Sequence, residues 1–194
     1  LFILLSIISV IVLNSTLYNG WRHMYFIYPA FVMIALVGIE FFLKIIKNKY
    51  VFIIFQLIII FTFINTSYWM VKNHPHQNVY FNRLAGKNIQ NKFEMDYWGL
   101  SYKENLDYLL KIDERDKLYI WNSSRIKMFY PLLSLNEKDR SKIVIVENKN
   151  DAEYWITNYY IDKKIYDEEF YKKYELIREI VVDGDPINSI FKKK

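Results

Sequence analysis

The chain has 194 residues, of which 53% are hydrophobic and 19% aromatic, and its formal net charge is +5. It contains no cysteine, which excludes disulfides, thiolate metal sites and cysteine nucleophiles. The charges are mixed in sign and form neither a basic stripe nor a nucleic-acid-binding motif, so we expect no nucleic-acid partner.

The charged residues are distributed unevenly along the chain. Residues 1–71 contain four basic side chains and one acidic side chain, whereas the remaining residues contain 22 basic and 20 acidic ones. An apolar part followed by a charged, aromatic-rich part is typical of membrane helices followed by a water-soluble domain. Because the chain starts inside an apolar run, we expect it to be the C-terminal part of a longer polypeptide.

Three apolar runs lie in the first part, at residues 1–13, 24–43 and 51–71. A membrane-spanning helix needs about 20 apolar residues. A helix in a soluble core would show a polar face at helical spacing, and the two longer runs show almost none. The pattern predicts two complete transmembrane helices, 24–43 and 51–71, and a truncated one, 1–13.

The lysines predict how these helices are oriented. Lys44, Lys47 and Lys49 lie between the second and third runs, and the positive-inside rule places such a loop in the cytoplasm. The loop before the second run carries one arginine and should face outward. We therefore expect a multi-pass protein of the cell membrane, in contact with membrane lipid, whose C-terminal part lies on the periplasmic or extracellular side.

The water-soluble part divides into an irregular, membrane-proximal connector, 72–100, and a small α/β domain with one mixed sheet, 101–194. Ser101 and Glu104 have the spacing of a capping box and predict a helix over 101–112. The remaining pattern predicts a helix near 124–133, strands at 117–121 and 142–147 and within 151–160, and two strands in 174–191 joined by a turn at 183–186.

A few residues are candidates for function. Arg22 and His23 precede the second run, where they either anchor the helix end or contact a lipid-linked phosphate, which suits a guanidinium. His74 and His76 form a weak metal-binding pattern, and we expect no metal and no cofactor. Glu94 and Asp96 have a spacing that allows acid–base chemistry, but we favour packing or hydrogen bonding near the start of the Ser101 helix.

Three motifs, in order, resemble those of a known enzyme class. YNGWRHMYFIYP, HPHQNVYFN and FEMDYWGLSY are similar to the patterns [DN]-G-x-R-H-x-x-F-x-x-P, H-P-Y-Q-x-x-Y-F-N and D-Y-W-G-x-S-Y. These patterns are typical of the C-terminal region of bacterial GT-C class membrane glycosyltransferases, which include relatives of the protein O-mannosyltransferases and of the lipid A aminoarabinose transferase. The resemblance covers roughly residues 18–110, and His76 stands where the pattern has an aromatic residue.

The resemblance implies an enzyme that transfers a sugar from a polyprenyl-phosphate donor at the outer face of the membrane. In this class the catalytic acid lies in the first outer loop, upstream of the residues matched here, so we do not expect this chain to act alone. The resemblance implies substrate-binding positions at Arg22, His23, His74, Gln77, Tyr80 and Asn82. The alternative is a non-enzymatic, membrane-anchored module whose outer α/β domain binds a cell-envelope partner.

Overall fold

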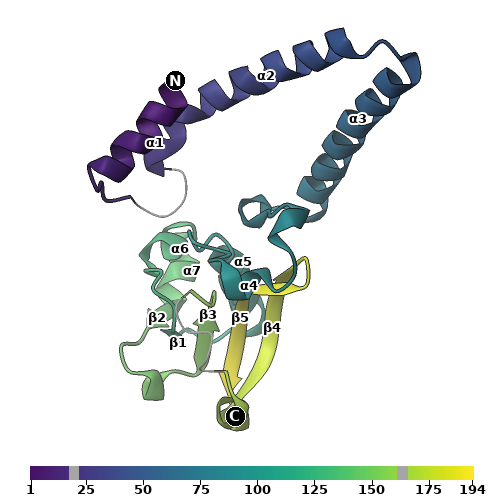
Figure 1. Ribbon diagram of the computed structural model, residues 1–194. Coiled ribbons are helices and arrows are strands. Elements are labelled where there is room, and N and C mark those ends of the chain that lie inside the picture. The colour runs from purple at the N-terminus through teal and green to yellow at the C-terminus, as the bar shows by residue number, and fades with distance from the viewer. Residues whose placement is uncertain (18–21, 161–165) are drawn as a thin grey trace. The chain divides into compact units, whose positions relative to one another are not determined.

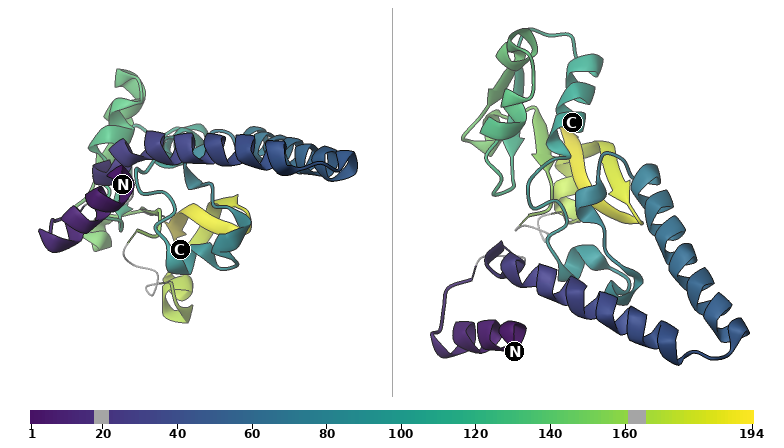
Figure 2. Two further views of the ribbon diagram at one scale, coloured as in Figure 1. Left: turned by 45° about the horizontal axis from the view of Figure 1, so that its top comes forward. Right: turned by 90° about the horizontal axis from the view of Figure 1, so that it is seen from above.

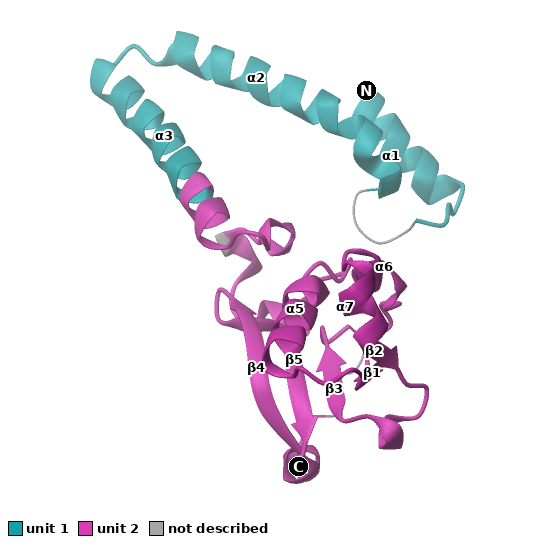
Figure 3. Ribbon diagram, turned by 180° about the vertical axis from the view of Figure 1, so that it is seen from behind, with its two compact units in different colours: residues 1–66 teal, residues 67–194 magenta. Residues whose placement is uncertain are grey.

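The computed structural model describes residues 1–17, 22–160 and 166–194, except for the side chain of Arg83. It consists of two compact units, Leu1–Thr66 and Ser67–Lys194 (Figures 1 and 3). The first unit is helical. The second contains a sheet with helices and also includes the last residues of the long helix that begins in the first unit.

The first unit is built from apolar helices. These are α1 (Phe2–Val12), the 3₁₀ helix η1 (Arg22–Ile27), which continues into α2 (Tyr28–Ile45), and most of α3 (Lys49–Lys72). Pro29 lies in the first turn of α2, where a proline costs no helical hydrogen bond. At the other end of α2, Lys44 Nζ lies 2.6 Å from Glu40 Oε1, so the one acidic residue of the first unit is paired.

The segments Arg22–Ile45 and Lys49–Lys72 are each 24 residues long and are long and apolar enough to cross a membrane. No residue of α2 or α3 is buried, so their Phe, Ile and Leu side chains form an apolar outer surface. A helix of this length extends about 36 Å, compared with about 30 Å for the hydrocarbon core of a bilayer. The prediction of two long apolar helices and a shorter one before them is confirmed.

The second unit contains a mixed sheet of five strands in the order β2-β1-β3-β5-β4. The strands are β1 (Leu118–Asn122), β2 (Ile143–Ile145), β3 (Tyr154–Thr157), β4 (Tyr174–Val182) and β5 (Asp185–Lys193). β1 pairs in parallel with both β2 and β3, whereas β5 is antiparallel to β3 and β4. β4 carries two register shifts relative to β5, and the hairpin that they form is visibly twisted (Figure 2).

The helices cover both faces of this sheet. On one face, α5 (Tyr102–Ile112) directs Tyr102, Leu106 and Leu109 against the sheet, at a spacing that places them on one side of a helix. On the other face, Trp155 and Phe191 pack against α8 (Glu168–Lys173). The remaining short helices are η2 (Gln77–Val79), η3 (Arg83–Ala85), α4 (Ile89–Lys92), α6 (Phe129–Leu133), α7 (Glu137–Lys142) and η4 (Lys149–Asp151).

The predicted α/β domain with a mixed sheet is confirmed, and each predicted strand is present with slightly different bounds. Asp183 and Gly184, both with positive φ, form the two-residue turn between β4 and β5, as the sequence indicated. The helix predicted at 124–133 begins only at Phe129, because hydrogen bonds from the Asn122 side chain hold the preceding residues in a loop.

The capping-box prediction is wrong. The Ser101 side chain makes no capping hydrogen bond, and Glu104 binds other residues. Two helices, α7 and α8, were missed, although Asn136 and Asp167 cap them through their side chains in the manner typical of helix starts.

A cluster of charged side chains at the amino end of β3 joins this strand to the end of α5. The Arg115 guanidinium donates to Asp113, with 2.7 Å between Nη2 and Oδ2, and also binds Glu153. These hydrogen bonds, with a further one from the Tyr154 hydroxyl, hold the pKa of Asp113 well below its usual range. In the unfolded chain the pKa of this aspartate is about 4. Because folding lowers the pKa, the interaction stabilises the fold at pH values above about 4, and this stabilisation is lost progressively as the pH falls below that value.

We therefore expect Arg115→Gln to lower the free energy of unfolding at pH 7 by up to about 1 kcal/mol and to flatten the loss of stability between about pH 4 and pH 2. Urea unfolding of the full chain in a neutral detergent, at pH 7, 4 and 2.5, measures both effects. Lys172→Gln, which removes an exposed charge from α8, is the control. An unchanged pH profile in Arg115→Gln would contradict this role.

Candidate functional site

The candidate residues lie in both units. Arg22 and His23 are exposed at the start of η1, directly before α2, in the first unit. His74, Gln77, Tyr80 and Asn82 lie in the second unit, on the segment that follows α3.

Gln77 connects this segment to the last turn of α3. Its Nε2 atom donates to the backbone oxygen of Met70 at 2.9 Å and lies 2.9 Å from Nδ1 of His74. Because Gln77 donates to Nδ1, the neutral His74 ring carries its proton on Nε2. The His74 side chain is exposed, so this N–H is directed away from the Gln77 contact.

Tyr80 and Asn82 have local structural roles. The Tyr80 ring meets the ring of Trp69 edge to face, with 4.8 Å between the ring centroids. Oδ1 of Asn82 accepts a hydrogen bond from the backbone N–H of Leu84 at 3.0 Å, which is a side-chain turn typical of asparagine. Tyr80 thus packs against the end of α3, and Asn82 sets the direction of the chain after it.

A further contact fixes the end of α3 to the sheet. Nε1 of Trp69 donates to Oδ2 of Asp183 at 2.6 Å, and Asp183 lies in the β4–β5 turn. Because Ser189 of β5 lies opposite Thr157 at the end of β3, this turn belongs to the edge where β1, β2 and β3 have their carboxyl ends. The apolar helix therefore ends at the carboxyl edge of the sheet.

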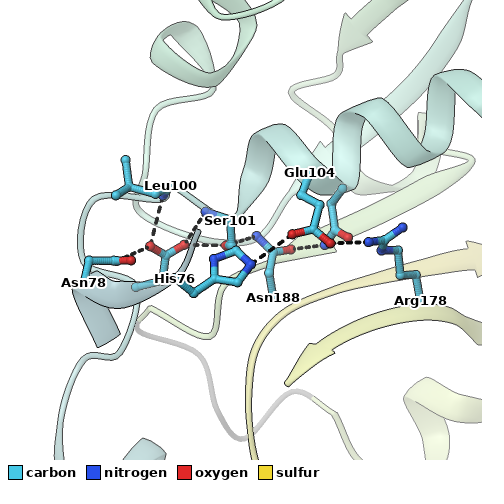
Figure 4. Close-up of polar contacts among 9 residues, drawn as sticks. His76, Asn78, Leu100, Ser101, Glu104, Arg178 and Asn188 are labelled. Atoms are coloured by element: carbon cyan, nitrogen blue, oxygen red, sulfur yellow. Dashed lines mark hydrogen bonds and ion pairs between the residues drawn. The ribbon is translucent and has the colours of Figure 1, made fainter. Parts of the chain in front are cut away.

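His76 is buried, with 6% of its surface exposed, and lies beside Glu104 of α5 (Figure 4). The distance between His76 Nε2 and Glu104 Oε2 is 2.9 Å. Glu104 also forms an ion pair with Arg178 of β4, whose guanidinium stacks on Tyr108, 4.5 Å from the ring centroid. Glu104 of α5 thus joins the connector to β4. In a capping box it would have bonded only within its own helix.

Asp96 is the centre of a second group of polar contacts, and Figure 4 labels its partners Asn78, Leu100 and Ser101. Asp96 is buried, with 2% of its surface exposed. Its carboxylate accepts hydrogen bonds from the backbone N–H groups of Leu100 and Ser101, at 3.0 and 3.1 Å. It also accepts from the Ser101 hydroxyl and from Asn78 Nδ2. A buried carboxylate with four donors has its lone pairs occupied and suits capping better than proton transfer. The preferred interpretation of Asp96, hydrogen bonding at the start of the helix, is confirmed.

The contacts continue from Asp96 into the core. Nδ2 of Asn188, on β5, donates to the Ser101 hydroxyl at 2.8 Å, and Nδ2 of Asn105 donates to Oδ1 of Asn188 at 2.7 Å. Ser101, Asn105 and Asn188 are fully buried. Their hydrogen bonds fix the position of α5 relative to the sheet, because a buried polar group that loses its partner is costly. Oδ1 of Asn105 is buried and has no partner among the described residues.

The two histidines of the H-x-H pattern have different partners, Gln77 for His74 and Glu104 for His76. Within residues 1–17, 22–160 and 166–194, no group of three or more His, Cys, Asp or Glu side chains is placed to hold a metal ion.

Sequence reasoning missed a group of polar residues at the carboxyl end of β1 and in the loop that follows it, namely Asn122, Ser124, Arg125 and Lys127. The signal was available, because NSSRIK directly follows the predicted strand KLYIW and polar residues in that position often bind ligands.

The chain has no match among protein-family models, curated proteins or solved structures.

Gly99 allows the Asp96 turn to approach the loop after β1. It has φ +67°, and a Cβ atom at this position would lie 2.8 Å from Cγ2 of Ile126 and 3.0 Å from Cδ2 of Tyr102. Gly184 also has positive φ, but nothing lies within 4 Å of its hypothetical Cβ.

We expect Gly99→Ala to lower the free energy of unfolding by about 2–4 kcal/mol, through backbone strain and overpacking together. Gly184→Ala should cost about 1 kcal/mol, because it adds strain alone. Urea unfolding of both variants of the full chain in neutral detergent compares them. Equal losses in the two variants would show that the contact between Gly99 and Ile126 is not tight.

Proposed function

We propose that the chain is the C-terminal portion of a membrane glycosyltransferase that transfers a sugar from a polyprenyl-phosphate donor on the outer face of the membrane. In this proposal, α2 and α3 span the bilayer and the α/β unit is an outer cap. The catalytic acid is supplied by a part of the enzyme upstream of these residues.

The resemblance of the three motifs, in their order, supports this proposal. So does the apolar surface of α2 and α3, which needs lipid or other apolar partners because none of their residues is buried.

The observation that carries the proposal is the use of the second and third motifs at one junction. Gln77 binds the last turn of α3, His76 reaches Glu104, and Asn78 donates to Asp96. The motif residues thus hold the connector between the end of an apolar helix and the α/β unit. Such a junction suits an enzyme in which an ordered connector leads from the end of a membrane helix into an outer domain.

Arg22 and His23 take the role of donor contacts in this proposal. Both are exposed at the start of the helical segment that includes α2, where a phosphate headgroup would lie if the segment spans the bilayer. A guanidinium can bind two phosphate oxygens at once. The other four candidate residues would then order the connector and would not contact the phosphate; they are His74, Gln77, Tyr80 and Asn82.

The sidedness of the proposal can be tested with single cysteines, because the chain has none of its own. We expect Lys149→Cys, in the α/β unit, to react with a membrane-impermeant maleimide in right-side-out membrane vesicles. Lys47→Cys, between α2 and α3, should react only after the vesicles are permeabilised. The reverse pattern would overturn the proposed orientation, and equal reaction of both sites in sealed vesicles would contradict membrane insertion.

The donor contact can be tested in the full-length enzyme. We expect Arg22→Ala to lower the release of polyprenyl phosphate from a polyprenyl-phosphate sugar by about 10- to 100-fold in nanodiscs, since a charge-assisted hydrogen bond contributes about 1.5–3 kcal/mol. Arg22→Lys should retain part of the activity. Lys44→Ala, at the other end of α2, should leave it unchanged. Normal activity of Arg22→Ala would remove Arg22 from the donor site.

The alternative is a membrane-anchored module that binds a cell-envelope partner. It is favoured by the separate hydrophobic core of the second unit, formed by α5 and the sheet, because such a core is what an independent binding domain needs. Sugar transfer by the full-length protein, lost in Arg22→Ala, would exclude this alternative.

A further inference from the structure

An open cleft of about 400 Å³ lies at the carboxyl ends of β1 and β2. The loop after β1 forms one side of it through Arg125 and Lys127. The apolar side chains of Ile126, Met128, Leu132 and Ile145 form much of the rest. No function derived above uses this cleft.

The charge of the cleft is positive. Arg125 and Lys127 line it, and its lining among the described residues includes no carboxylate. Two cations on one wall attract an anion, and a guanidinium matches the geometry of phosphate oxygens. Arg125 also interacts electrostatically with Tyr160, which follows β3.

The loop that carries these cations is held in place by its own hydrogen bonds. Nδ2 of Asn122 donates to the backbone oxygen of Ile126 at 2.6 Å, and the fully buried Tyr102 donates its hydroxyl to Oδ1 of Asn122 at 2.7 Å. The side chain of Ser124 accepts from the backbone N–H of Ile126 at 3.1 Å. A loop fixed in this way needs little ordering when a ligand binds.

The topology favours this edge as a binding site. The chain leaves β1 toward β2 on one side, whereas β3, on the other side of β1, leads on to the β4–β5 hairpin. The two connections diverge at the carboxyl ends of β1 and β3. In open α/β sheets, ligands bind at the carboxyl edge, in the crevice at such a divergence. The cleft at β1 and β2 lies on the same edge, directly beside that point.

The apolar part of the cleft indicates the rest of the ligand. Phe129 and Leu132 both belong to α6 and both line the cleft, and Phe129 is 62% exposed. An inorganic anion would leave this apolar surface unused, whereas an anion with an apolar chain would cover it. The cleft also lies on the sheet edge at which α3 ends, through Trp69 and Asp183.

We propose that the cleft binds a phosphate ester that carries an apolar chain, with Arg125 and Lys127 on the phosphate and Ile126, Met128 and Leu132 on the chain. The lipid origin of this ester rests on the proposed function, because only membrane insertion of α3 places this edge near lipid. The phosphate contact itself depends on the cleft alone.

The experiment is calorimetric titration of the full chain, in a neutral maltoside detergent, with hexyl phosphate and separately with inorganic phosphate. We expect saturable binding of hexyl phosphate and at least tenfold weaker binding of inorganic phosphate. Arg125→Gln combined with Lys127→Gln should weaken the binding of hexyl phosphate by at least about tenfold, because it removes both cations. Lys149→Gln combined with Lys172→Gln removes two exposed charges outside the cleft and should change the affinity less than twofold.

Arg125→Lys combined with Lys127→Arg keeps both charges and should retain affinity within about threefold, which separates loss of charge from loss of fold. Absence of saturable binding by the unaltered chain, or equal affinity of the double glutamine variant, would overturn the proposal. Equal affinity for inorganic and hexyl phosphate would overturn the role of the apolar wall. The titration depends neither on the orientation of the protein in the membrane nor on sugar transfer. If hexyl phosphate binds but the cysteine labelling contradicts membrane insertion, the proposed function is refuted and the phosphate site in the cleft is retained.

Discussion

The buried carboxylate of Asp96 is the interaction on which the second unit depends. It receives two backbone N–H groups at the start of α5, the Ser101 hydroxyl and the Asn78 amide. The backbone oxygen of the same residue accepts from Asn158, just after β3, at 2.8 Å. Asp96 therefore joins the connector to both α5 and the sheet. An unpaired carboxylate at this depth would be costly, so these donors must stay in place as long as the unit is folded.

The same arrangement explains why the connector is ordered although most of it has no regular structure. Its apolar residues Val79, Ile89 and Met95 are buried against β4 and β5, and His76 and Asn78 supply polar contacts on either side of them. Trp69 and Gln77 add the end of α3 to this assembly. The last turn of α3 is therefore joined to the rest of the second unit by several contacts.

The polar ends of the parallel strands and the end of α3 share one edge of the sheet. The loop after β1 is fixed by Asn122 and Tyr102, and Gly99 lets the Asp96 turn pack directly against that loop. The turn that caps α5 thus also supports the loop that carries Arg125 and Lys127. If the proposed function holds, the motif with Asp96 and Gly99 acts as a scaffold for surfaces near the membrane, and the chemistry belongs to other parts of the enzyme.

The sequence alone determined the apolar helices, the strands and the turn at Asp183–Gly184, because these follow from hydrophobic runs, β-periodicity and local turn preference. It also indicated that Asp96 would bind near the start of α5. Only the tertiary structure decided which partners the polar side chains find. Glu104 was expected to cap its own helix and instead pairs with His76 and Arg178, 28 and 74 positions away. The cleft beside Arg125 likewise exists only because β2 lies beside β1. Contacts between residues far apart in the chain depend on strand order and packing, which no local pattern encodes.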